Sequence, residues 1–514
     1  IDPVIDGNGT VTSFSRPSLD FNNRNPLIAQ GGWLSQDDNV MTSNNREAET
    51  YVIGGNVEWE ATQDIAVNLD VSASNATRDA TNPFVVVGKF STTSPLVQLP
   101  GSSGIGTVTN LSDLTDTSLQ RLHFVNVQRD AVEDDILEIK GDIDWSVDRG
   151  PLKTVSSGFS YTDREKTRDQ FDNFSATQGF GIFCAYCGYT VPLPDASVLA
   201  PFQFDGFLDD ASGSGSVPSS ILAFSFSDLF AQLNSDAAIT AANRAGRGAI
   251  SDADLIARRN AAGNSPFGFY EPDLNTAASF GVQEEITAFY VNTEWEGDIG
   301  GLPWGANVGF RVSQTDVVST GVDQPVLEIR ESVGDTQLDI IFGSPTDVSV
   351  SNDYINFLPS FNFNVEPTDD TVLRLSYSDT VTRPTLTALG VSNTFGGRSN
   401  APVSGGGNPQ LEAFESSNWD ISFEWYYDDL SFFGVSAFHK DFENFLESQA
   451  LPVLRPILFP AGNPGNPSAV DVVQEVAFQD TRTRNGETGS ISGIEVAFQR
   501  TFESLPAPFD GLGT

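Results

Sequence analysis

The chain has 514 residues, of which 69 are acidic and 27 are basic, and its formal net charge is −42 at pH 7. This excess of negative charge excludes a nucleic-acid partner, because phosphates need basic side chains. No segment offers about 18 uninterrupted apolar residues, so a transmembrane helix is excluded and any membrane-embedded part must be a closed sheet.

The two ends of the sequence look like cuts within a longer precursor. Ile1-Asp2-Pro3 has no initiator Met, and no basic or apolar leader segment follows it. Asp6-Gly7-Asn8-Gly9 resembles the start of a calcium loop, but no Glu stands at the twelfth position, so we interpret it as a turn. Gly511-Leu512-Gly513-Thr514 stops in a predicted turn, which leaves the predicted sheet unfinished.

The clearest predicted element is a β-hairpin over residues 135–161. Its first strand has an apolar face and a charged face, because successive side chains of a strand point to opposite sides. Residues 148–151 have turn chemistry, and an extended pattern resumes at residue 152. The apolar face holds Leu137, Ile139, Ile143, Trp145 and Val147, and the charged face holds Glu138, Lys140, Asp142 and Asp144.

The same unit recurs at 51–74, 286–312 and 421–437. In each copy an alternating run reaches a tryptophan, passes through a short turn and continues as a second alternating run. Amphipathic rings at strand ends suit a membrane–water boundary. We therefore predict four membrane-interface aromatics, which are Trp59, Trp145, Trp295 and Trp425.

A soluble antiparallel sandwich also alternates, but strand length and loop length favour an antiparallel transmembrane β-barrel. The predicted strands approach or exceed the roughly 9–11 residues that cross a bilayer, against roughly 5–6 in soluble sheets. Short periplasmic turns and long outer loops alternate in outer-membrane barrels. The short connections are 61–64, 148–151, 297–303, 366–370 and 428–430, and the long ones lie near 80–130, 170–283 and 382–415.

The excursion at 170–283 contains both cysteines, Cys184 and Cys187. A zinc site would need two more ligands, and the histidines, His123 and His439, belong to other segments. A redox pair would stand beside a βαβ unit, which is absent. We interpret the pair as a loop disulfide, with a free or redox pair as the alternative, and we expect no metal and no cofactor.

Two stretches of the same excursion, 227–233 and 251–260, have helical composition. Acidic residues suit the first turn of a helix and basic residues the last; here these are Asp228, Asp252, Arg258 and Arg259. We expect short helices on an outer loop, with a dedicated partner-binding helix as the alternative.

Nothing in the sequence predicts an enzyme, since GxSxG and HExxH motifs are absent and carboxylate pairs are uninformative in so acidic a chain. The glycines at 405–407 are expected in a loop, because a phosphate cradle would need a following helix with a lysine. Weak candidates for lining a solute path are the predicted lumen residues, although solvation of a polar interior explains them equally well. These are Glu138, Asp142, Arg311 and Arg374.

From Tyr354 onward the chain carries an ordered series of short motifs. They are Asn356-Phe357-Leu358-Pro359-Ser360, Leu373-Arg374-Leu375-Ser376-Tyr377-Ser378, Thr382-Arg383-Pro384, Gly407-Asn408-Pro409-Gln410-Leu411, Ser417-Asn418-Trp419-Asp420 and Phe438-His439-Lys440-Asp441-Phe442. The series resembles the distal barrel of TonB-dependent outer-membrane receptors. Residues 161–169 are similar to a strand-to-loop segment of the long-looped bacterial subgroup, so the resemblance covers most of the chain from about residue 47.

The resemblance implies a partial receptor barrel over 1–514, with 170–283 as a long extracellular loop region. In the family, a 22-stranded barrel encloses an N-terminal plug that binds TonB and gates uptake. Neither the plug with its coupling segment nor the final aromatic-ended strand is found here. The implied location is the bacterial outer membrane, among lipid and lipopolysaccharide. The implied activity is import of a scarce large solute, such as a siderophore or an oligosaccharide, driven by TonB-ExbB-ExbD through the missing plug.

Two other classes stay open: a passive porin-like channel and a secreted all-β binding module. One test separates the binding module from any barrel. In a receptor barrel or a porin the side chains of Ile143, Phe289 and Phe423 face lipid, whereas in the module they lie between two packed layers. An unfinished barrel would leave backbone groups unpaired at its edges, so we expect the isolated chain to aggregate.

Overall fold

The computed structural model describes residues 2–5, 11–15, 35–91, 96–99, 106–109, 113–118, 120–173, 191–193, 195–203, 218–245, 251–331, 338–428, 430–463, 465–502, 506 and 513. The chain forms two compact units. Unit 1 comprises Ile1–Glu47, Asp79–Ala131 and Gln170–Asn275, and unit 2 comprises Ala48–Arg78, Val132–Asp169 and Thr276–Thr514.

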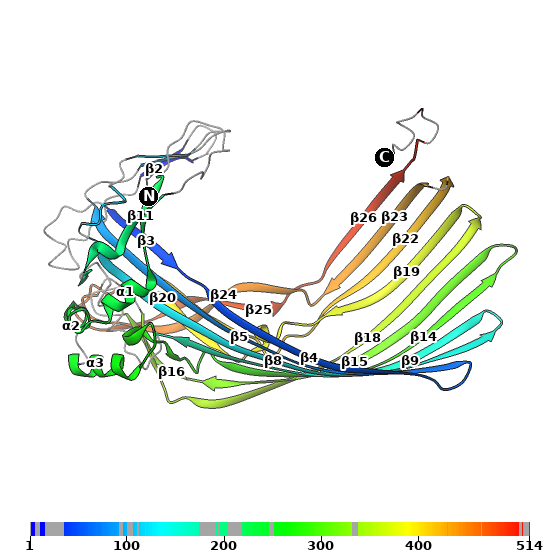
Figure 1. The fold of residues 1–514 in the computed structure, drawn as a ribbon, viewed down its shortest axis with the longest axis horizontal. Coiled ribbons are helices and arrows are strands. Elements are labelled where there is room, and N and C mark those ends of the chain that lie inside the picture. Colours follow the sequence, from blue (N-terminus) through cyan, green and yellow to red (C-terminus); the bar gives the residue numbers. More distant parts are fainter. Residues whose placement is uncertain are drawn as a thin grey trace. The chain divides into compact units, whose positions relative to one another are not determined.

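The largest sheet has 14 strands, and its long strands run side by side through unit 2 (Figure 1). The strands are β3 (Ser35–Thr42), β4 (Asn45–Glu60), β5 (Ile65–Ser91), β8 (Arg121–Arg149), β9 (Leu152–Asp172), β10 (Val191–Pro192), β13 (Asp273–Leu274), β14 (Phe280–Asp298), β15 (Pro303–Asp323), β18 (Thr346–Thr368), β19 (Thr371–Thr382), β22 (Phe414–Asp428), β23 (Ser431–Glu443) and β26 (Gly489–Gln499). The main path runs in the order β26-β23-β22-β19-β18-β15-β14-β9-β8-β5-β3, with β4 on β5, β10 on β8 and β13 on β9. No pairing within the described residues joins the two ends of this path.

Short turns join consecutive strands where the sequence predicts them, which confirms the four hairpins. The gaps between paired strands are 61–64, 150–151, 299–302, 369–370 and 429–430. In the β14–β15 hairpin the register is unbroken, from Phe280 opposite Gly321 to Asp298 opposite Pro303. Its turn contains Gly300 at φ 68° and Gly301 at φ 92°, backbone angles that glycine adopts without a steric penalty.

One face of this sheet carries a band of exposed apolar side chains, here called the apolar belt. Register places Phe159, Phe289, Val312 and Phe357 side by side on four neighbouring strands. The discriminating residues are exposed: Ile143 by 51%, Phe289 by 61% and Phe423 by 39%. They are not enclosed between two layers, so the all-β barrel prediction is confirmed and the packed sandwich is excluded.

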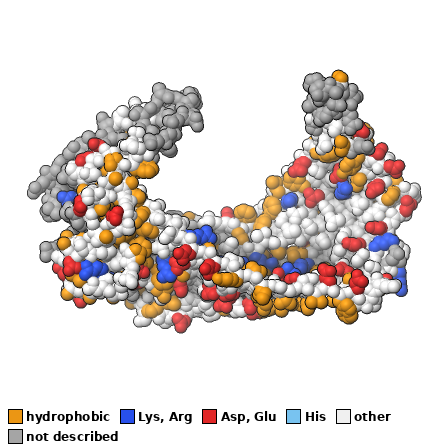
Figure 2. Space-filling view, viewed as in Figure 1, with side chains coloured by type: hydrophobic (Ala, Val, Ile, Leu, Met, Phe, Trp, Pro, Cys, Tyr) orange, Lys and Arg blue, Asp and Glu red, His pale blue; other side chains and the backbone are white. Residues whose placement is uncertain are grey.

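Hydrophobic side chains gather in patches along the long strands in Figure 2, with acidic side chains beside them. The four predicted interface tryptophans lie on strands of this sheet, close to the short turns. Trp59, Trp145 and Trp425 are exposed by 62%, 44% and 46%. Their placement at a lipid headgroup boundary stays a prediction.

A second sheet of unit 2 has six strands, which the sequence pattern did not reveal. It has the order β17-β16-β24-β25-β21-β20. Its strands are β16 (Val326–Glu331), β17 (Leu338–Phe342), β20 (Asn393–Arg398), β21 (Ala401–Gly406), β24 (Leu446–Phe459) and β25 (Val472–Asn485). Three different connections of the main sheet supply these strands, so no single stretch of sequence shows the sheet.

Asp480 ties β25 to β21 within this second sheet. The carboxylate is buried and accepts hydrogen bonds from Ser404 Oγ at 2.8 Å, Arg482 Nε at 2.9 Å and Arg484 Nη2 at 3.1 Å. Burial by itself raises the pKa of Asp480, but the hydrogen bonds from Ser404 and Arg482 and the positive charges of both arginines outweigh it and hold the pKa below the ordinary 3.8.

The lowered pKa of Asp480 predicts an acid-labile second sheet. A carboxyl whose folded pKa is depressed contributes stability that is complete above the unfolded pKa and is lost as pH falls through the folded value. We expect amide exchange in β25 to accelerate as pH falls below about 4, after correction for the intrinsic exchange rate. The Asp480→Asn variant should already be less protected at pH 7 and should show a weaker pH dependence. Parallel pH profiles for the two proteins would contradict the assignment.

Unit 1 contains the helices α1 (Phe226–Leu233), α2 (Asp236–Ala245) and α3 (Asp252–Ala261). Ser225 and Ser251 cap α1 and α3 by accepting from the backbone N–H of Asp228 and Asp254, which satisfies donors that the first turn leaves open. The two predicted helices and their charge placement are confirmed, and α2 was not predicted. None of the helices within the described ranges is long and apolar enough to span a membrane.

The core of unit 1 forms where α1 packs on an aromatic segment. Leu229, Phe230 and Leu233 of α1 are buried together with Tyr270, and each such side chain contributes about 1.5–3 kcal/mol by leaving water. The remaining elements of this unit are short: β1 (Asp2–Ile5), β2 (Val11–Ser15), β6 (Leu96–Gln98), β7 (Thr107–Thr109), η2 (Ala196–Val198), β11 (Leu199–Gln203), β12 (Ser220–Phe224) and η3 (Gly268–Tyr270).

Some predicted boundaries were wrong. The excursion expected near 80–130 is shorter, since β5 continues to Ser91 and β8 begins at Arg121. The apolar alternation fades along these strand ends, so the sequence pattern stops before the backbone pairing does. The predicted Cys184–Cys187 disulfide and the turn at 6–9 lie outside the described residues.

A lysine in the apolar belt should prevent stable insertion into a bilayer. Phe289 stands six residues from Trp295, about 20 Å along the strand, which places it near the middle of a tilted crossing. We expect Phe289→Lys to cost about 2–4 kcal/mol, measured by urea titration of the full-length protein folded into phospholipid vesicles. The control is Asn292→Lys, on the opposite face of the same strand, which should change stability much less. Equal losses for the two variants would contradict the assignment of the faces.

Candidate functional site

The candidate functional site is the side of the main sheet opposite the apolar belt, here called the polar face. The four predicted lumen residues lie on this face, but the structure does not gather them into one cluster. Glu138 contacts Lys140 on the same strand at 2.8 Å, and Arg374 pairs with Glu424 of β22 at 2.6 Å. Asp142, on the same strand as Glu138, and Arg311 of β15 belong to a separate group.

Tyr290 connects Asp142 and Arg311 within a group that spans the four neighbouring strands β8, β9, β14 and β15. Its hydroxyl donates to Asp142 Oδ1 at 2.6 Å, and its backbone pairs with Arg311, whose Nη2 donates to Ser160 Oγ at 2.7 Å. Gly158 lies under this group, and a Cβ there would collide with the carboxylate of Asp142 and the ring of Tyr290. The glycine therefore allows these side chains to lie close over the backbone.

Arg383 is the residue of the polar face that the sequence reasoning missed. It belongs to the Thr382-Arg383-Pro384 motif, which stands at the start of the long connection expected at 382–415. The guanidinium turns back onto β15 and donates to Thr315 Oγ1 at 3.0 Å and to Ser313 Oγ at 2.7 Å. These contacts join positions about 70 residues apart in the chain, and no local pattern marks them.

A buried carboxylate lies beside Arg383. Glu284 is only 5% exposed, and the charges of Arg383 and Arg164 both act on it. Its Oε2 has no hydrogen-bond partner among the described residues, and neither does the buried Oδ1 of Asn356. Unsatisfied buried polar atoms cost free energy, so this part of the polar face is suited to a further polar group or water.

The segment after Arg383 folds onto the same sheet through an apolar contact. Thr385 caps the short helix α4 (Leu386–Leu389) by accepting from the backbone N–H of Ala388. A small hydrophobic core then holds the segment down; it consists of Phe280, Val282, Val317, Leu386, Leu389 and Leu411. The region 382–415 is therefore a folded element of unit 2 rather than an open loop.

The glycines at 405–407 were expected in a loop, but Gly405 and Gly406 are the last residues of β21. Here they allow close approach of neighbouring backbone. A Cβ on Gly405 would meet the carbonyl oxygen of Thr481 at 2.7 Å, and one on Gly407 would collide with the carbonyl oxygen of Gly390. Larger residues would separate β21 from β25 and the segment from α4. These contacts account for the glycines without any bound phosphate.

Further along the polar face, Asp134 forms ion pairs with two basic side chains. Its Oδ2 lies 2.6 Å from Arg164 Nη2 and 2.9 Å from Lys166 Nζ. Because Arg164 also acts on Glu284, acidic and basic groups alternate over β8, β9 and β14. The face thus presents hydrogen-bond donors and acceptors of both charges.

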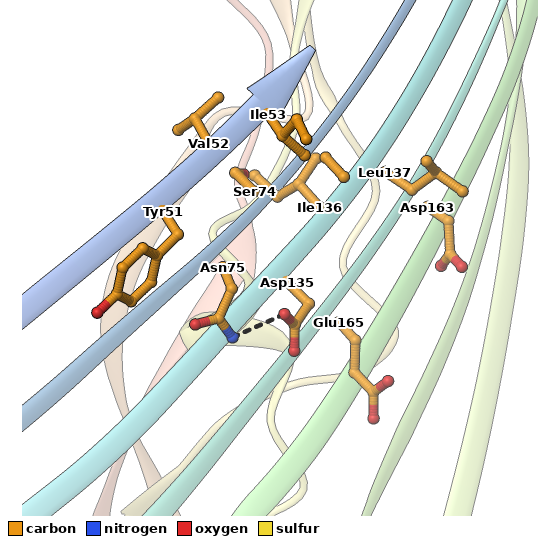
Figure 3. Close-up of a pocket in the computed structure, with 11 residues that line it drawn as sticks. Tyr51, Val52, Ile53, Ser74, Asn75, Asp135, Ile136, Leu137, Asp163 and Glu165 are labelled. Carbon is orange, nitrogen blue, oxygen red and sulfur yellow. Dashed lines mark hydrogen bonds between the residues drawn. The ribbon is translucent and has the colours of Figure 1, made fainter.

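The side of the sheet that carries the apolar belt also contains a hollow of about 610 Å³ (Figure 3). Tyr51, Ile53 and Leu137 line one part of it, and the carboxylates of Asp163 and Glu165 line another. Asn75 Nδ2 donates to Asp135 Oδ1 at 2.8 Å within it. The hollow thus marks the edge of the apolar belt, where apolar side chains give way to acidic and amide groups.

Ser492, His439 and Asp441 lie in a row that superficially resembles a catalytic triad. His439 Nδ1 is 2.7 Å from Ser492 Oγ, and its Nε2 is 3.1 Å from Asp441 Oδ2. The side chains of His439 and Asp441 are 46% and 58% exposed, whereas a triad depends on a buried carboxylate and an enclosed oxyanion site. In the described part of the chain, no group of three or more His, Cys, Asp and Glu side chains is placed to hold a metal ion.

Removing the Arg383 side chain should loosen the segment that follows it. Arg383→Ala deletes two hydrogen bonds from a charged group and leaves Glu284 with less compensation, and we expect a local loss of about 1.5–3 kcal/mol. Faster amide exchange at α4 in the full-length protein would show it. The control Arg374→Ala breaks an exposed pair and should cost about 0–1 kcal/mol. Unchanged exchange at α4 in Arg383→Ala would rule out the anchoring role.

Comparison with solved structures gives matches of low similarity. The hemophore receptor HasR of Serratia marcescens, solved with its hemophore HasA and heme, is 10% identical with a TM-score of 0.32, over 88% of this chain and 52% of that chain. The ferric enterobactin receptor PfeA of Pseudomonas aeruginosa is 9% identical with a TM-score of 0.30, over 90% and 60%. The ferric-catecholate import receptor Fiu of E. coli is 11% identical with a TM-score of 0.36, over 90% and 57%.

The chain thus spans between about half and 60% of the length of these receptors. No curated protein matches it. The family model described as "TonB dependent receptor-like, beta-barrel" matches residues 87–513, which is most of the chain. This match confirms the predicted family and the bacterial outer-membrane location. The chain therefore belongs to the TonB-dependent receptor-like β-barrel family.

Proposed function

We propose that this chain is the barrel part of a TonB-dependent receptor that imports a scarce, large solute across the outer membrane. The observation that carries the proposal is the division of one continuous sheet into an apolar belt and a polar face. In a bilayer, a closed sheet satisfies its backbone internally, shows apolar side chains to lipid and encloses a polar interior. The polar face would then line the route of the solute.

The contacts of the polar face support selective binding rather than free diffusion. Its charged groups are held in pairs and networks, as in Asp142 with Tyr290 and Asp134 with Arg164. The segment anchored by Arg383 also occupies part of this face. Fixed side chains that present both donors and acceptors can recognise a particular polar solute, with Arg311, Arg374, Glu138 and Asp142 among the candidates.

The proposed partners follow from the two faces and the family. The apolar belt would contact lipid, and the acidic and amide groups at its edge, such as Asp135 and Asp163, would lie among lipopolysaccharide headgroups. Energy would reach the barrel from TonB-ExbB-ExbD through a plug domain. A siderophore and an oligosaccharide are both suitable cargoes in size and polarity.

Uptake by intact cells tests the import proposal. A strain that lacks the native receptor would be given the full-length gene and offered labelled ferric siderophores and labelled oligosaccharides, with and without a functional TonB. We expect saturable accumulation of one solute class only when both the receptor and TonB are present. The variant Asn292→Lys adds a charge to the polar face. Its uptake profile, compared at an equal amount of protein in the membrane, tests whether such a charge changes which solute is taken up.

Two outcomes would overturn the proposal. Accumulation that is non-saturable and independent of TonB would assign the chain to passive channels. Full-length protein that remains monodisperse in buffer without detergent would assign it to secreted binding modules, because an apolar belt in water should drive association.

A further inference from the structure

Unit 1 contains a cavity of its own, separate from the polar face of the main sheet. Its volume is about 480 Å³, within the roughly 300–1,000 Å³ typical of small-molecule sites. Side chains from the β3–β4 junction, β5, β8, α1 and the segment around η3 line it. All of its lining residues belong to unit 1.

The apolar part of this cavity is a continuous aromatic wall. Phe226 stacks on Phe230 with ring centroids 6.4 Å apart, and Phe230 meets Phe267 edge-to-face at 5.2 Å. Phe230 is buried in the core of the unit, which fixes the wall, while Phe226 and Phe267 are only partly buried. Their ring faces can therefore receive a ligand without rearrangement of the core.

Polar groups stand around this wall and are held in place. Arg129 forms a two-pronged contact with Asp79, with Nε 3.0 Å from Oδ1 and Nη2 2.5 Å from Oδ2, and its guanidinium lies 4.9 Å from the ring centroid of Phe171. Glu271 accepts a hydrogen bond from Ser265 Oγ, and both of these residues line the cavity.

The charge balance of the cavity selects the kind of ligand. The lining holds one basic and one acidic side chain, Arg129 and Glu271, whose opposite charges attract each other. The lining thus has no net formal charge, which suits a neutral polar ligand better than an anionic iron chelate. The hydroxyl and amide side chains of Ser43, Asn45 and Thr81 add further hydrogen-bonding groups to the lining.

We propose that this cavity binds one or two rings of a neutral carbohydrate. The apolar face of a sugar ring would stack on Phe226 and Phe267, as bases and other rings do on aromatic side chains. Its hydroxyls would donate to Glu271 and accept from Arg129. The inference names a solute class for the proposed function. Sugar binding in the cavity does not depend on that function, but the interpretation of the sugar as the imported solute rests on it.

Direct binding to the purified full-length receptor in detergent tests this assignment. Maltose, cellobiose and N,N′-diacetylchitobiose would be titrated one at a time and followed by saturation-transfer NMR. We expect at least one of them to bind, and Phe267→Leu and Glu271→Gln each to weaken that sugar by roughly tenfold. Phe202→Leu is the matched control, an exposed aromatic residue of the same unit outside the cavity, and it should bind as the native protein does.

Thermal unfolding of each variant separates lost binding from lost folding, and Glu271→Gln keeps the size of the side chain. The assignment is overturned if none of the three sugars binds, or if a bound sugar is insensitive to both cavity substitutions. It is also overturned if dihydroxybenzoate or tetramethylammonium binds there and the sugars do not. Sugar binding without TonB-dependent uptake would support the cavity assignment and contradict the import proposal. TonB-dependent uptake of another solute without sugar binding would support the import proposal and contradict the cavity assignment.

Discussion

The constraint on which this structure depends is that backbone amides cannot remain unpaired in hydrocarbon. A chain without an apolar helix can meet it only by long strands paired edge to edge, and β5, β8 and β18 exceed 20 residues each. Once the strands are paired, alternation divides the sheet into two chemically different sides. The apolar belt and the polar face are thus two results of one pairing scheme.

This division also explains where chemistry can concentrate. Charged side chains are costly on the lipid side, so the networks around Tyr290, Asp134 and Arg383 lie on the polar face. They are pairs and relays of hydrogen bonds rather than a nucleophile with its base. Such a surface suits the proposed passage of a polar solute. The Arg383 contact adds a folded segment to it, held by two hydrogen bonds and a small apolar core.

Unit 1 follows different rules because its core excludes water with helices and aromatic residues. The fixed ring of Phe230 and the clamped guanidinium of Arg129 create a cavity whose shape is set before any ligand arrives. Preorganisation of this kind reduces the ordering cost of binding. Unit 1 and the polar face therefore offer two distinct recognition surfaces within one chain, the first for an apolar ring face and the second for polar groups.

The sequence alone determined the hairpins, the two faces and the family, because strand alternation and turn chemistry are local properties that repeat every two residues. It also placed α1 and α3, since helical composition and the acidic and basic ends of a helix are local as well. Only tertiary structure decided the six-stranded sheet, the contact of Arg383 with Ser313 and Thr315, and the aromatic cavity. Each of these joins segments that are far apart along the chain, and contacts of that range leave no period or spacing in the sequence.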